Sequence, residues 1–576
     1  MRARVKEVLF FINKVKFLKF QILLSALVKF TVKLLEFHFF LSLLLALHQA
    51  ILQKHIDHSQ MLYVFMLYGI YLAAQFCDTC LSHNISYHVI KKLRDNIFAH
   101  YYKISPGAVE DVKEGDFIQM IVNDINVFEW YIAHILTEWI SLLFLSVAIA
   151  WRFFSNSLSA GIALTALMLY TVTGFLSTAN TQEQQGIEIK NLGGALLANV
   201  IDGISGYKEL KFFNKEKDFF RKIDSKSRAF NQIYSLYTLG ELKTHLRADL
   251  GALLILPIII ASLHTDGIFW MKDITTIFLY CLIARNCLHQ TGNYGFIFGA
   301  MHRLKRIYDI PPPVAHYGPL SLDASSGDWG IEFKNCDFSY NKNASKHILK
   351  NVSFTAKKGE KTVLVSASGG GKSTIFKLIN RYYEAGGGEI FLFGKDITQY
   401  TEKTLRENIT TFDQITFLFN DTVLNNLKYA DKNMKFSQIE QMAKKLNALD
   451  FIVSKEKGFD TIVSEAGDNY SGGERQRLAL LRGLLKDAPI LLMDEVSSAL
   501  DEQNSERLND VLDDIKKHKV ILMASHKLST IKRADKIIFL KEGEVIQTGT
   551  YTELLTSDDF RKLLKHDKGD NVKNEY

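Results

Sequence analysis

The first three hundred residues contain runs of apolar side chains long enough to cross a bilayer. A spanning helix needs about 20 mainly apolar residues, and six segments come close to that length. The candidates lie within residues 20–52, 61–81, 127–150, 158–176, 250–263 and 274–300. The fifth segment is short and the sixth contains polar residues, so both depend partly on the pattern of the other four. These runs predict an α-helical polytopic membrane domain.

Basic side chains gather in two of the segments that connect these runs, residues 91–113 and 190–243, whereas the connections near His55, Arg152 and Asp266 are short. Lys and Arg are enriched in the cytoplasmic loops of membrane proteins. Six crossings then place the N-terminus, both long loops and the second half of the chain in the cytoplasm. The net charge of +7 is therefore expected from cytoplasmic loops, and nucleic-acid binding is not predicted.

Composition changes along the chain and divides it into four parts. Residues 1–307 form the predicted membrane domain, and residues 308–330, rich in Pro, Ser and Gly, form a linker. Residues 331–567 have the mixed charge and Gly-punctuated strands of a soluble α/β domain. Residues 568–576 form a polar tail. Five cysteines in 576 residues give no disulfide framework.

A glycine-rich turn follows the apolar segment 361–365 and precedes a predicted helix. A strand–loop–helix of this kind directs backbone N–H groups and a helix N-terminus at phosphates. We expect Lys372 to reach the β- and γ-phosphates, Ser373 to hold Mg²⁺, and Thr374 to assist near the α-phosphate. The predicted phosphate-binding residues are Ser368, Gly369, Gly370, Gly371, Lys372, Ser373 and Thr374.

This turn departs from the usual phosphate loop at its first position, where Ser366 replaces Gly. Glycine permits a backbone conformation with positive φ, which other residues adopt only at a cost. The sequence therefore predicts some conformational strain at Ser366.

Two further apolar segments end in residues suited to phosphate chemistry. Asp494 ends the segment 490–493 and is placed to hold Mg²⁺ through water. Glu495 follows and is placed to orient and deprotonate an attacking water. His526 follows the segment 520–524, a position that favours a contact with the γ-phosphate. The alternatives are a solvated turn for the acidic pair and a structural role for the histidine.

The segment 470–477 reads Tyr-Ser-Gly-Gly-Glu-Arg-Gln-Arg and lies about twenty residues before the acidic pair. This element, in this order with the phosphate loop, resembles the signature of the ABC ATPase cassettes. Tyr470 stands for the usual Leu and Glu474 for the usual Gln. Together with six predicted helices, it makes the whole chain resemble an ABC exporter half-transporter, and segment 461–467 resembles that group's T-x-V-G-E-x-G motif.

The resemblance implies a P-loop NTPase fold for the cassette, with ATP and Mg²⁺ as its ligands. Gln414 resembles the Gln loop that reaches Mg²⁺ and the attacking water. Tyr340 lies at a suitable distance upstream to stack on adenine, and the alternative is an ordinary strand aromatic. The implied catalytic residues are Lys372, Gln414, Glu495 and His526, and the implied metal ligands are Ser373, Gln414 and Asp494.

The family fold pairs two chains, with the nucleotides between the cassettes. Ser471, Gly472 and Gly473 of one chain would complete the site formed by Lys372 of the other. Because the catalytic residues are intact, a homodimer is favoured over a heterodimer. The family also implies two short cytoplasmic coupling helices, expected near residues 105–114 and 203–213.

Several ionisable side chains fall inside the predicted spans, where such residues often have a function. Lys33 and Glu36 lie one helical turn apart and are expected to pair. The others lie on the third and sixth spans: Glu129, His134, Glu138, Arg285, Asn286, His289 and Gln290. These residues line a polar cavity for a charged or peptide-like cargo, pair between helices, or are exposed where the helices leave the bilayer. Cys77 and Cys80 supply at most half of a soft-metal site.

The sequence thus predicts an ATP-driven transporter in a lipid bilayer, in the inner membrane of a bacterium. A peptide or siderophore is the favoured cargo, partly because segment 206–211 resembles exporters of that group, and a lipid is the second choice. The alternatives are an importer on the exporter fold and an ATP-gated channel or regulator that pumps no cargo.

Overall fold

The structure is a computed structural model that describes residues 10–11, 13–14, 18–53, 57–109, 114–156, 158–262, 278, 294–310, 317–321, 330–340, 347–464, 467–497 and 500–566. The chain divides into two compact units. A membrane unit contains Met1–Ile104 and Glu110–Ile310, and a cassette unit contains Ser105–Val109 and Pro311–Tyr576.

The described part of the membrane unit is helical. Its helices are α2 (Lys19–Gln53), α3 (His58–Tyr101), α5 (Glu114–Gln119), α6 (Val127–Trp130), α7 (Thr137–Asn156), α8 (Leu158–Ser205), α9 (Tyr207–Phe212), α10 (Glu216–Ser262) and α12 (Tyr294–Tyr308). Two wider π-helical turns, Met120–Asp124 and Tyr131–Leu136, join α5, α6 and α7 into one long helical segment. Turns of this type are frequent at functional sites.

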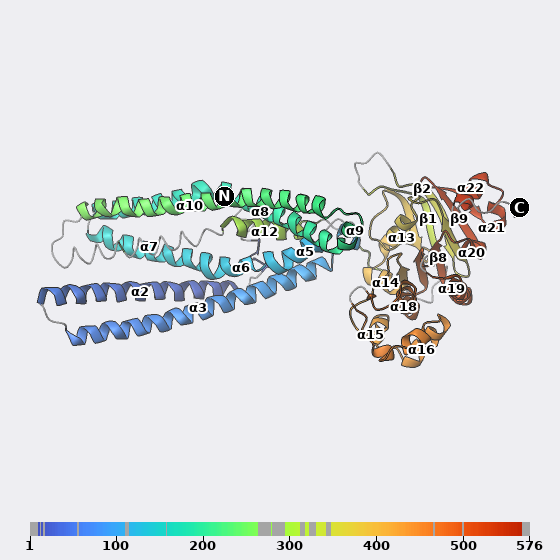
Figure 1. The fold of residues 1–576 in the computed structure, drawn as a ribbon, viewed down its shortest axis with the longest axis horizontal. Coiled ribbons are helices and arrows are strands. Elements are labelled where there is room, and N and C mark those ends of the chain that lie inside the picture. Colours follow the sequence, from blue (N-terminus) through green and yellow to red (C-terminus); the bar gives the residue numbers. More distant parts are fainter. Residues whose placement is uncertain are drawn as a thin grey trace. The chain divides into compact units, whose positions relative to one another are not determined.

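The long helices of the membrane unit pack side by side (Figure 1). Helix α2 packs against α3 and α7, and α8 packs against α7, α10 and α12. Gly186, Gly295 and Gly299 let the backbones of α8 and α12 touch, because a Cβ added at Gly299 would lie 2.9 Å from the Gly186 carbonyl oxygen. Small residues commonly permit such close helix packing in membranes.

Three helical segments of the described chain are long and apolar enough to span a bilayer: Lys19–Leu52, His58–Tyr101 and Phe117–Trp151. They contain the first three predicted spans. The fourth and fifth predicted spans fall on α8 and α10, of 48 and 47 residues. Most of the sixth predicted span, residues 274–293, lies outside the described residues apart from Phe278.

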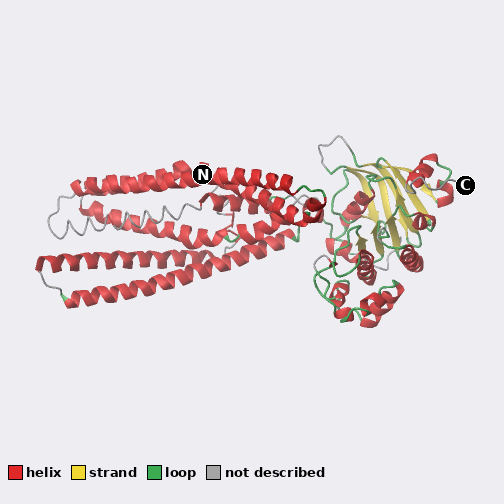
Figure 2. Ribbon diagram, viewed as in Figure 1, coloured by secondary structure: helices red, strands yellow, loops and turns green. Residues whose placement is uncertain are grey.

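The cassette unit contains all the strands of the described chain (Figure 2). A four-stranded antiparallel sheet has the order β2-β1-β4-β5, and a six-stranded sheet has the order β10-β9-β3-β8-β7-β6. Strands β9, β3, β8, β7 and β6 run parallel. The strands are β1 (Gly330–Phe338), β2 (Leu349–Lys357), β3 (Lys361–Val365), β4 (Gly387–Leu392), β5 (Lys395–Asp396), β6 (Ile409–Phe412), β7 (Ile490–Asp494), β8 (Val520–Ala524), β9 (Lys536–Lys541) and β10 (Glu544–Gly549).

Helices cover the six-stranded sheet and carry the signature element. They are α13 (Lys372–Ile379), α14 (Glu402–Asn408), α15 (Val423–Lys428), α16 (Phe436–Lys445), α17 (Leu449–Val453), α18 (Gly472–Leu485), α19 (Glu502–Ile515), α20 (Leu528–Lys532), α21 (Tyr551–Leu554) and α22 (Asp558–His566). The short helix α4 (Pro106–Val109) also belongs to this unit.

Apolar side chains on both faces of the six-stranded sheet form two separate cores. Val363 and Val365 of β3 join one core, and Leu364 between them joins the other. Side chains alternate along a strand, so a parallel sheet covered on both faces needs the unbroken apolar runs found here. This burial fixes the ends of β3, β7 and β8 as a rigid base for the site.

Candidate functional site

The parallel strands place four distant segments at one edge of the sheet. The carboxyl ends of β3, β8, β7 and β6 are neighbours in that order. The phosphate loop, His526, the Asp494–Glu495 pair and the segment leading to Gln414 follow those four ends. Ligands of open α/β sheets bind beyond these carboxyl ends. The predicted residues therefore come together because of strand order.

A cavity of about 610 Å³ lies at this edge. It contains nearly all of the predicted nucleotide-site residues of the chain. The lining residues are Tyr340, Ile348, Ser366, Ala367, Ser368, Gly369, Gly370, Gly371, Lys372, Ser373, Thr374, Gln414, Asp494, Glu495 and His526.

The phosphate loop turns sharply before α13. Gly369 and Gly371 have φ values of 78° and 95°, in the left-handed region that glycine adopts without a steric penalty. A Cβ at Gly371 would also lie 2.6 Å from a methyl group of Leu349. The turn leaves the N-terminus of α13 facing the cavity, an arrangement suited to an anion.

The predicted backbone strain at Ser366 is wrong. Ser366 is not among the residues with positive φ, so serine meets no conformational penalty there. Its side chain instead contacts the lysine of the loop: Lys372 Nζ donates to the Ser366 carbonyl oxygen at 3.0 Å and to its Oγ at 3.2 Å. The substitution therefore changes the hydrogen bonding of Lys372, and leaves the backbone unstrained.

Glu495 connects three of the predicted residues. Gln414 Nε2 donates to Glu495 Oε2 at 3.0 Å, and His526 Nδ1 lies 3.6 Å from Glu495 Oε1. The backbone N–H of Glu495 donates to the Ala524 carbonyl oxygen of β8 at 3.0 Å. Glu495 itself has a φ of 50°, an uncommon conformation for a residue with a side chain. Such backbone geometry is often found at active sites.

Asp494 lies deeper in the same cavity. Burial raises the pKa of this carboxyl group; a hydrogen bond from Ser373 lowers it, repulsion from Glu495 raises it, and Lys372 lowers it. A bound cation would relieve the burial penalty on the carboxylate. The carboxylate, the Ser373 hydroxyl and the Gln414 amide are oxygen donors of the kind that Mg²⁺ prefers. These residues therefore fit a magnesium ion, with water completing its coordination.

Tyr340 lies just beyond β1 and lines the cavity with 45% of its surface exposed. Its hydroxyl lies 3.1 Å from Thr374 Oγ1 of α13. Sequence reasoning missed Ile348 and Ala367 as lining residues. Ile348 N–H donates to the Phe338 carbonyl oxygen at 2.8 Å. This β1–β2 pairing, which a sequence-based hairpin assignment could have found, brings Ile348 beside Tyr340.

The predicted signature residues do not line this cavity. Ser471 caps α18: its Oγ accepts from the Glu474 N–H at 3.3 Å, and the Glu474 carboxylate accepts from the Ser471 N–H at 2.7 Å. This reciprocal cap satisfies two N–H groups at the start of the helix. Glu474 therefore performs the capping role that a glutamine would perform, and Ser471–Gly473 remain separate from the chain's own phosphate loop.

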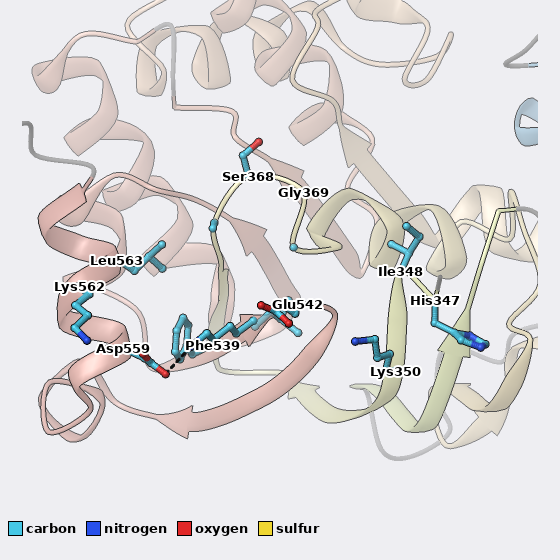
Figure 3. A pocket seen from close by; sticks show the side chains of 14 residues that line it. His347, Ile348, Lys350, Ser368, Gly369, Phe539, Glu542, Asp559, Lys562 and Leu563 are labelled. Atoms are coloured by element: carbon cyan, nitrogen blue, oxygen red, sulfur yellow. Dashed lines mark hydrogen bonds and ion pairs between the residues drawn. The ribbon is translucent and has the colours of Figure 1, made fainter. Parts of the chain in front are cut away.

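The far side of the phosphate loop borders a second cavity of about 650 Å³ (Figure 3). Ala367, Ser368, Gly369 and Gly370 line both cavities. The other walls come from the start of β2, the β9–β10 turn and α22. Lys541 and Asp559 bridge two of these walls at 2.8 Å. The loop thus has space on both sides.

The two segments predicted to couple the domains contain short helices. Helix α4 lies within residues 105–114, and α9 lies within residues 203–213. Ser105 Oγ donates to the Tyr382 carbonyl oxygen at 3.0 Å, and Tyr383 Oη donates to the Gly107 carbonyl oxygen at 2.8 Å. Residues 105–109 thus pack as part of the cassette unit. They contact residues 382 and 383, which follow α13.

Ionisable residues of the predicted spans pair within a helix or between helices. Lys33 Nζ lies 3.3 Å from Glu36 Oε2, which confirms that predicted pair. Glu129 lies 3.0 Å from His83, and Glu138 lies 3.5 Å from Lys29. His134 stacks near Trp130, with ring centroids 4.5 Å apart.

The remaining predicted positions are the polar residues of the sixth span and the two cysteines of the second span. Arg285, Asn286, His289 and Gln290 lie outside the described residues. Cys77 and Cys80 are exposed, and no group of three or more His, Cys, Asp or Glu side chains in the described chain could hold a metal ion.

The comparisons agree with this architecture. Residues 349–498 match the sequence profile of the ABC transporter family, and residues 20–239 match that of the ABC transporter transmembrane region. The ATP-dependent lipid A-core flippase of Vibrio vulnificus (strain YJ016) is 30% identical over 521 residues, which are 86% of each chain. The protein of that name from Salmonella paratyphi A (strain ATCC 9150 / SARB42) is 41% identical over 239 residues, which are 41% of this chain and 40% of the relative.

A solved structure of a bacterial Atm1-family ABC exporter with ATP bound has the same fold. The TM-score is 0.80 and the identity 23%, and the match covers 97% of this chain and 99% of the other. Taken with the phosphate loop, the acidic pair and the signature element, these matches are decisive. The chain therefore belongs to the ABC transporter family, as an exporter-type half-transporter in which one helical membrane domain is joined to one ATP-hydrolysing cassette.

Proposed function

We propose that two copies of this chain export an amphipathic lipid across the inner membrane of a bacterium. The relatives named as lipid A-core flippases support a lipid cargo, because the similarity to the Vibrio vulnificus protein extends over 86% of both chains. The preference for a peptide or siderophore rests on the short segment 206–211 and on polar residues within the predicted spans, and it is replaced by the lipid. The N-terminus and the cassette lie in the cytoplasm in this proposal, as the distribution of basic residues favours.

The cavity residues divide the work of ATP hydrolysis between binding and chemistry. The N–H groups of Ser368–Gly371 and the α13 N-terminus hold the phosphates, with Lys372 on the β- and γ-phosphates and Thr374 beside the α-phosphate. Tyr340 stacks on adenine. Mg²⁺, when bound through Ser373, Asp494 and Gln414, offsets phosphate charge.

Glu495 is placed to take the proton of the attacking water. Its carboxylate has partners on both sides, Gln414 and His526, so its orientation is set before the nucleotide arrives. His526 is then placed to contact the γ-phosphate.

The proposed domain boundaries lie at residues 307, 330 and 567. They separate the membrane domain, the linker, the cassette and the polar tail.

One observation supports a dimer in which each ATP contacts both chains. The cavity that contains the phosphate loop of this chain includes neither Ser471, Gly472 nor Gly473. The start of α18 nevertheless presents N–H groups suited to a phosphate. We infer that these residues complete the cavity of a second copy, so that each ATP contacts both chains.

The test uses purified full-length chain in liposomes. A fluorescent lipid A analogue, a labelled linear peptide and an iron siderophore are offered separately, with ATP inside or outside. Lipid movement away from the cassette side, with ATP turnover rising at least a few fold on lipid addition, is the expected result. Peptide or siderophore movement without lipid movement would overturn the cargo, movement toward the cassette side would indicate an importer, and ATP-gated ion current alone would indicate a channel.

A further inference from the structure

The three helical segments with the composition of membrane spans each contribute one ionisable side chain to a buried triad. Lys29 lies on α2, Asp78 on α3 and Glu138 on α7. Their side chains retain 7%, 4% and 14% of their exposed surface. Ionised groups at such positions are costly unless they are paired.

The ammonium group of Lys29 has acceptors on three sides. Its Nζ donates to the Ala133 carbonyl oxygen at 3.0 Å and lies 3.6 Å from Asp78 Oδ2 and 3.5 Å from Glu138 Oε1. Ala133 belongs to a π-helical turn, and its carbonyl oxygen also accepts from the Thr137 hydroxyl at 3.0 Å. The Lys29 ammonium group therefore lies among one carbonyl and two carboxyl acceptors.

The triad then contains one positive charge and two negative charges. Lys33 also lies within electrostatic reach of Asp78, but Lys33 is 3.3 Å from Glu36 of its own helix. Farther along, Glu129 is paired with His83, and the ring of His134 lies 5.1 Å from that of His83. Within the triad, Lys29 is thus the one ammonium group shared by two carboxyl groups, those of Asp78 and Glu138.

Asp78 is the carboxyl group that the structure leaves incomplete. Its Oδ1 atom is buried and has no hydrogen-bond partner among the described residues. Ser25, one turn before Lys29 on α2, likewise has a buried Oγ with no such partner. A carboxylate oxygen in this setting costs more to bury than a neutral carboxyl group does.

We propose that the triad binds one proton, taken from water and held as an O–H bond on Asp78 Oδ1, while the three helices are packed as described. Protonation converts Asp78 from a carboxylate to a carboxylic acid and leaves Lys29 paired with Glu138, so the buried cluster becomes neutral. Separation of α2 from α3 and α7 would release that proton to water. Lower pH therefore favours the packed arrangement, independently of the cargo that the chain carries.

The experiment is infrared spectroscopy of the full-length chain in nanodiscs, without nucleotide, between pH 5 and pH 9. A neutral carboxyl group absorbs in a region free of carboxylate bands, and ¹³C labelling of aspartate carboxyl groups shifts the band only when an aspartic acid carries the proton. The expected result is a neutral-carboxyl band at pH 7 that shifts on aspartate labelling, disappears in Asp78→Asn and persists in Asp224→Asn. Asp224 is a suitable control because its carboxylate is 41% exposed and paired with Arg228.

Three outcomes would overturn the proposal. They are no neutral-carboxyl band in the wild type at pH 7, a band that does not shift on aspartate labelling, or a band that Asp78→Asn retains and Glu138→Gln loses. The labelling arm uses the wild-type chain, so it still shows whether an aspartic acid carries the proton when Asp78→Asn does not fold, and a band that disappears in Asp494→Asn would also overturn the proposal.

Discussion

In the nucleotide cavity, the side chains of Glu495 and His526 are in contact with solvent, whereas the charged side chains of the membrane triad are buried. In the cavity, the side chains of His526 and Glu495 are 46% and 21% exposed. In the triad, those of Lys29 and Asp78 are 7% and 4% exposed. The first site presents donors to a polyanion at the solvent boundary, and the second places one ammonium group beside two buried carboxyl groups.

This difference predicts that substitutions in the cavity mainly lower the rate of ATP hydrolysis, whereas substitutions in the triad mainly lower the stability of the fold. A charge removed from the cavity costs catalysis and leaves the fold intact, because water already solvates much of the site. A charge removed from the triad leaves its partners buried without compensation, so the fold suffers first. The following substitutions test that contrast, from the largest expected effect to the smallest.

Glu495→Gln is expected to lower ATP turnover by about 10²- to 10⁴-fold, the usual contribution of a positioned general base. Because the glutamine keeps the shape of the side chain, ATP remains bound, and the melting temperature stays close to that of the wild type. Phosphate release and retained radiolabelled ATP measure the two effects. Glu407→Gln, at an exposed carboxylate 3.7 Å from Lys403, is the control. Wild-type turnover in Glu495→Gln would remove Glu495 as the base.

Lys29→Met is expected to destabilise the membrane unit by about 3–5 kcal/mol, the cost of breaking a buried ion pair from one side. Thermal unfolding in detergent measures the loss. Lys33→Met, whose ion pair with Glu36 is 15% and 21% exposed, should cost less. If Asp78 is already neutral, Glu138→Gln added to Lys29→Met restores more stability than Asp78→Asn does. Equal stability of Lys29→Met and the wild type would contradict the triad.

Gly472→Ala separates folding from dimer formation. A Cβ at Gly472 meets no atom within 4 Å in the described structure, and alanine favours the first turn of α18. The cassette should therefore fold at least as well. Turnover should fall by up to about 100-fold, because a displacement of ~1 Å in a closely approached site has that effect. Full ATPase activity in Gly472→Ala would argue against a nucleotide seated on this helix N-terminus.

Asp494→Asn is expected to raise the melting temperature of the nucleotide-free chain while abolishing magnesium-dependent turnover. Burial raises the pKa of Asp494 above its value in the unfolded chain. The folded state then loses stability as pH rises from the unfolded pKa through the raised folded pKa, and the penalty is complete above it. A gain of about 1–3 °C at pH 8, shrinking toward pH 4, is the expected result. A lower melting temperature at pH 8 would show that the carboxylate stabilises the fold.

Ser366→Ala is the smallest change. It removes the hydroxyl group that lies 3.2 Å from Lys372 Nζ but keeps the backbone carbonyl contact. Lys372 should then reach the phosphates more readily, and the Kd for ATP should fall by about 2- to 5-fold, which corresponds to part of one hydrogen bond. Titration with a fluorescent ATP analogue measures this change. Weaker binding would mean that the Ser366 hydroxyl itself holds the nucleotide.

The cassette site could be predicted residue by residue, since its signals are local. Lys372, Asp494 and His526 each follow an apolar strand, and parallel strands bring such ends together without further information. Ile348 was missed because its place in the cavity depends on the register of β1 with β2. The prediction of backbone strain at Ser366 is wrong because the loop has positive φ at Gly369 and Gly371 and not at position 366.

In the membrane unit, the first three predicted spans agree with the described helices, whereas the ion pairs between helices could not be predicted. Lys33 and Glu36 are neighbours on one helix, so their spacing alone predicts the contact. Lys29 and Asp78 were not singled out, because their meeting depends on how α2 and α3 are rotated about their axes. Apolar runs fix the length of a helix, and packing against neighbouring helices fixes which side faces inward.

The left-handed backbone of Glu495 has a consequence for how this enzyme could decay. Asn, Asp and Gly tolerate that geometry better than Glu, so replacing the base with any of them would ease the turn while silencing hydrolysis. Substitutions at position 495 that abolish hydrolysis would thus stabilise the fold, and only selection for ATP turnover opposes them. Inactive descendants of this chain should accumulate small residues at position 495 before they lose anything else.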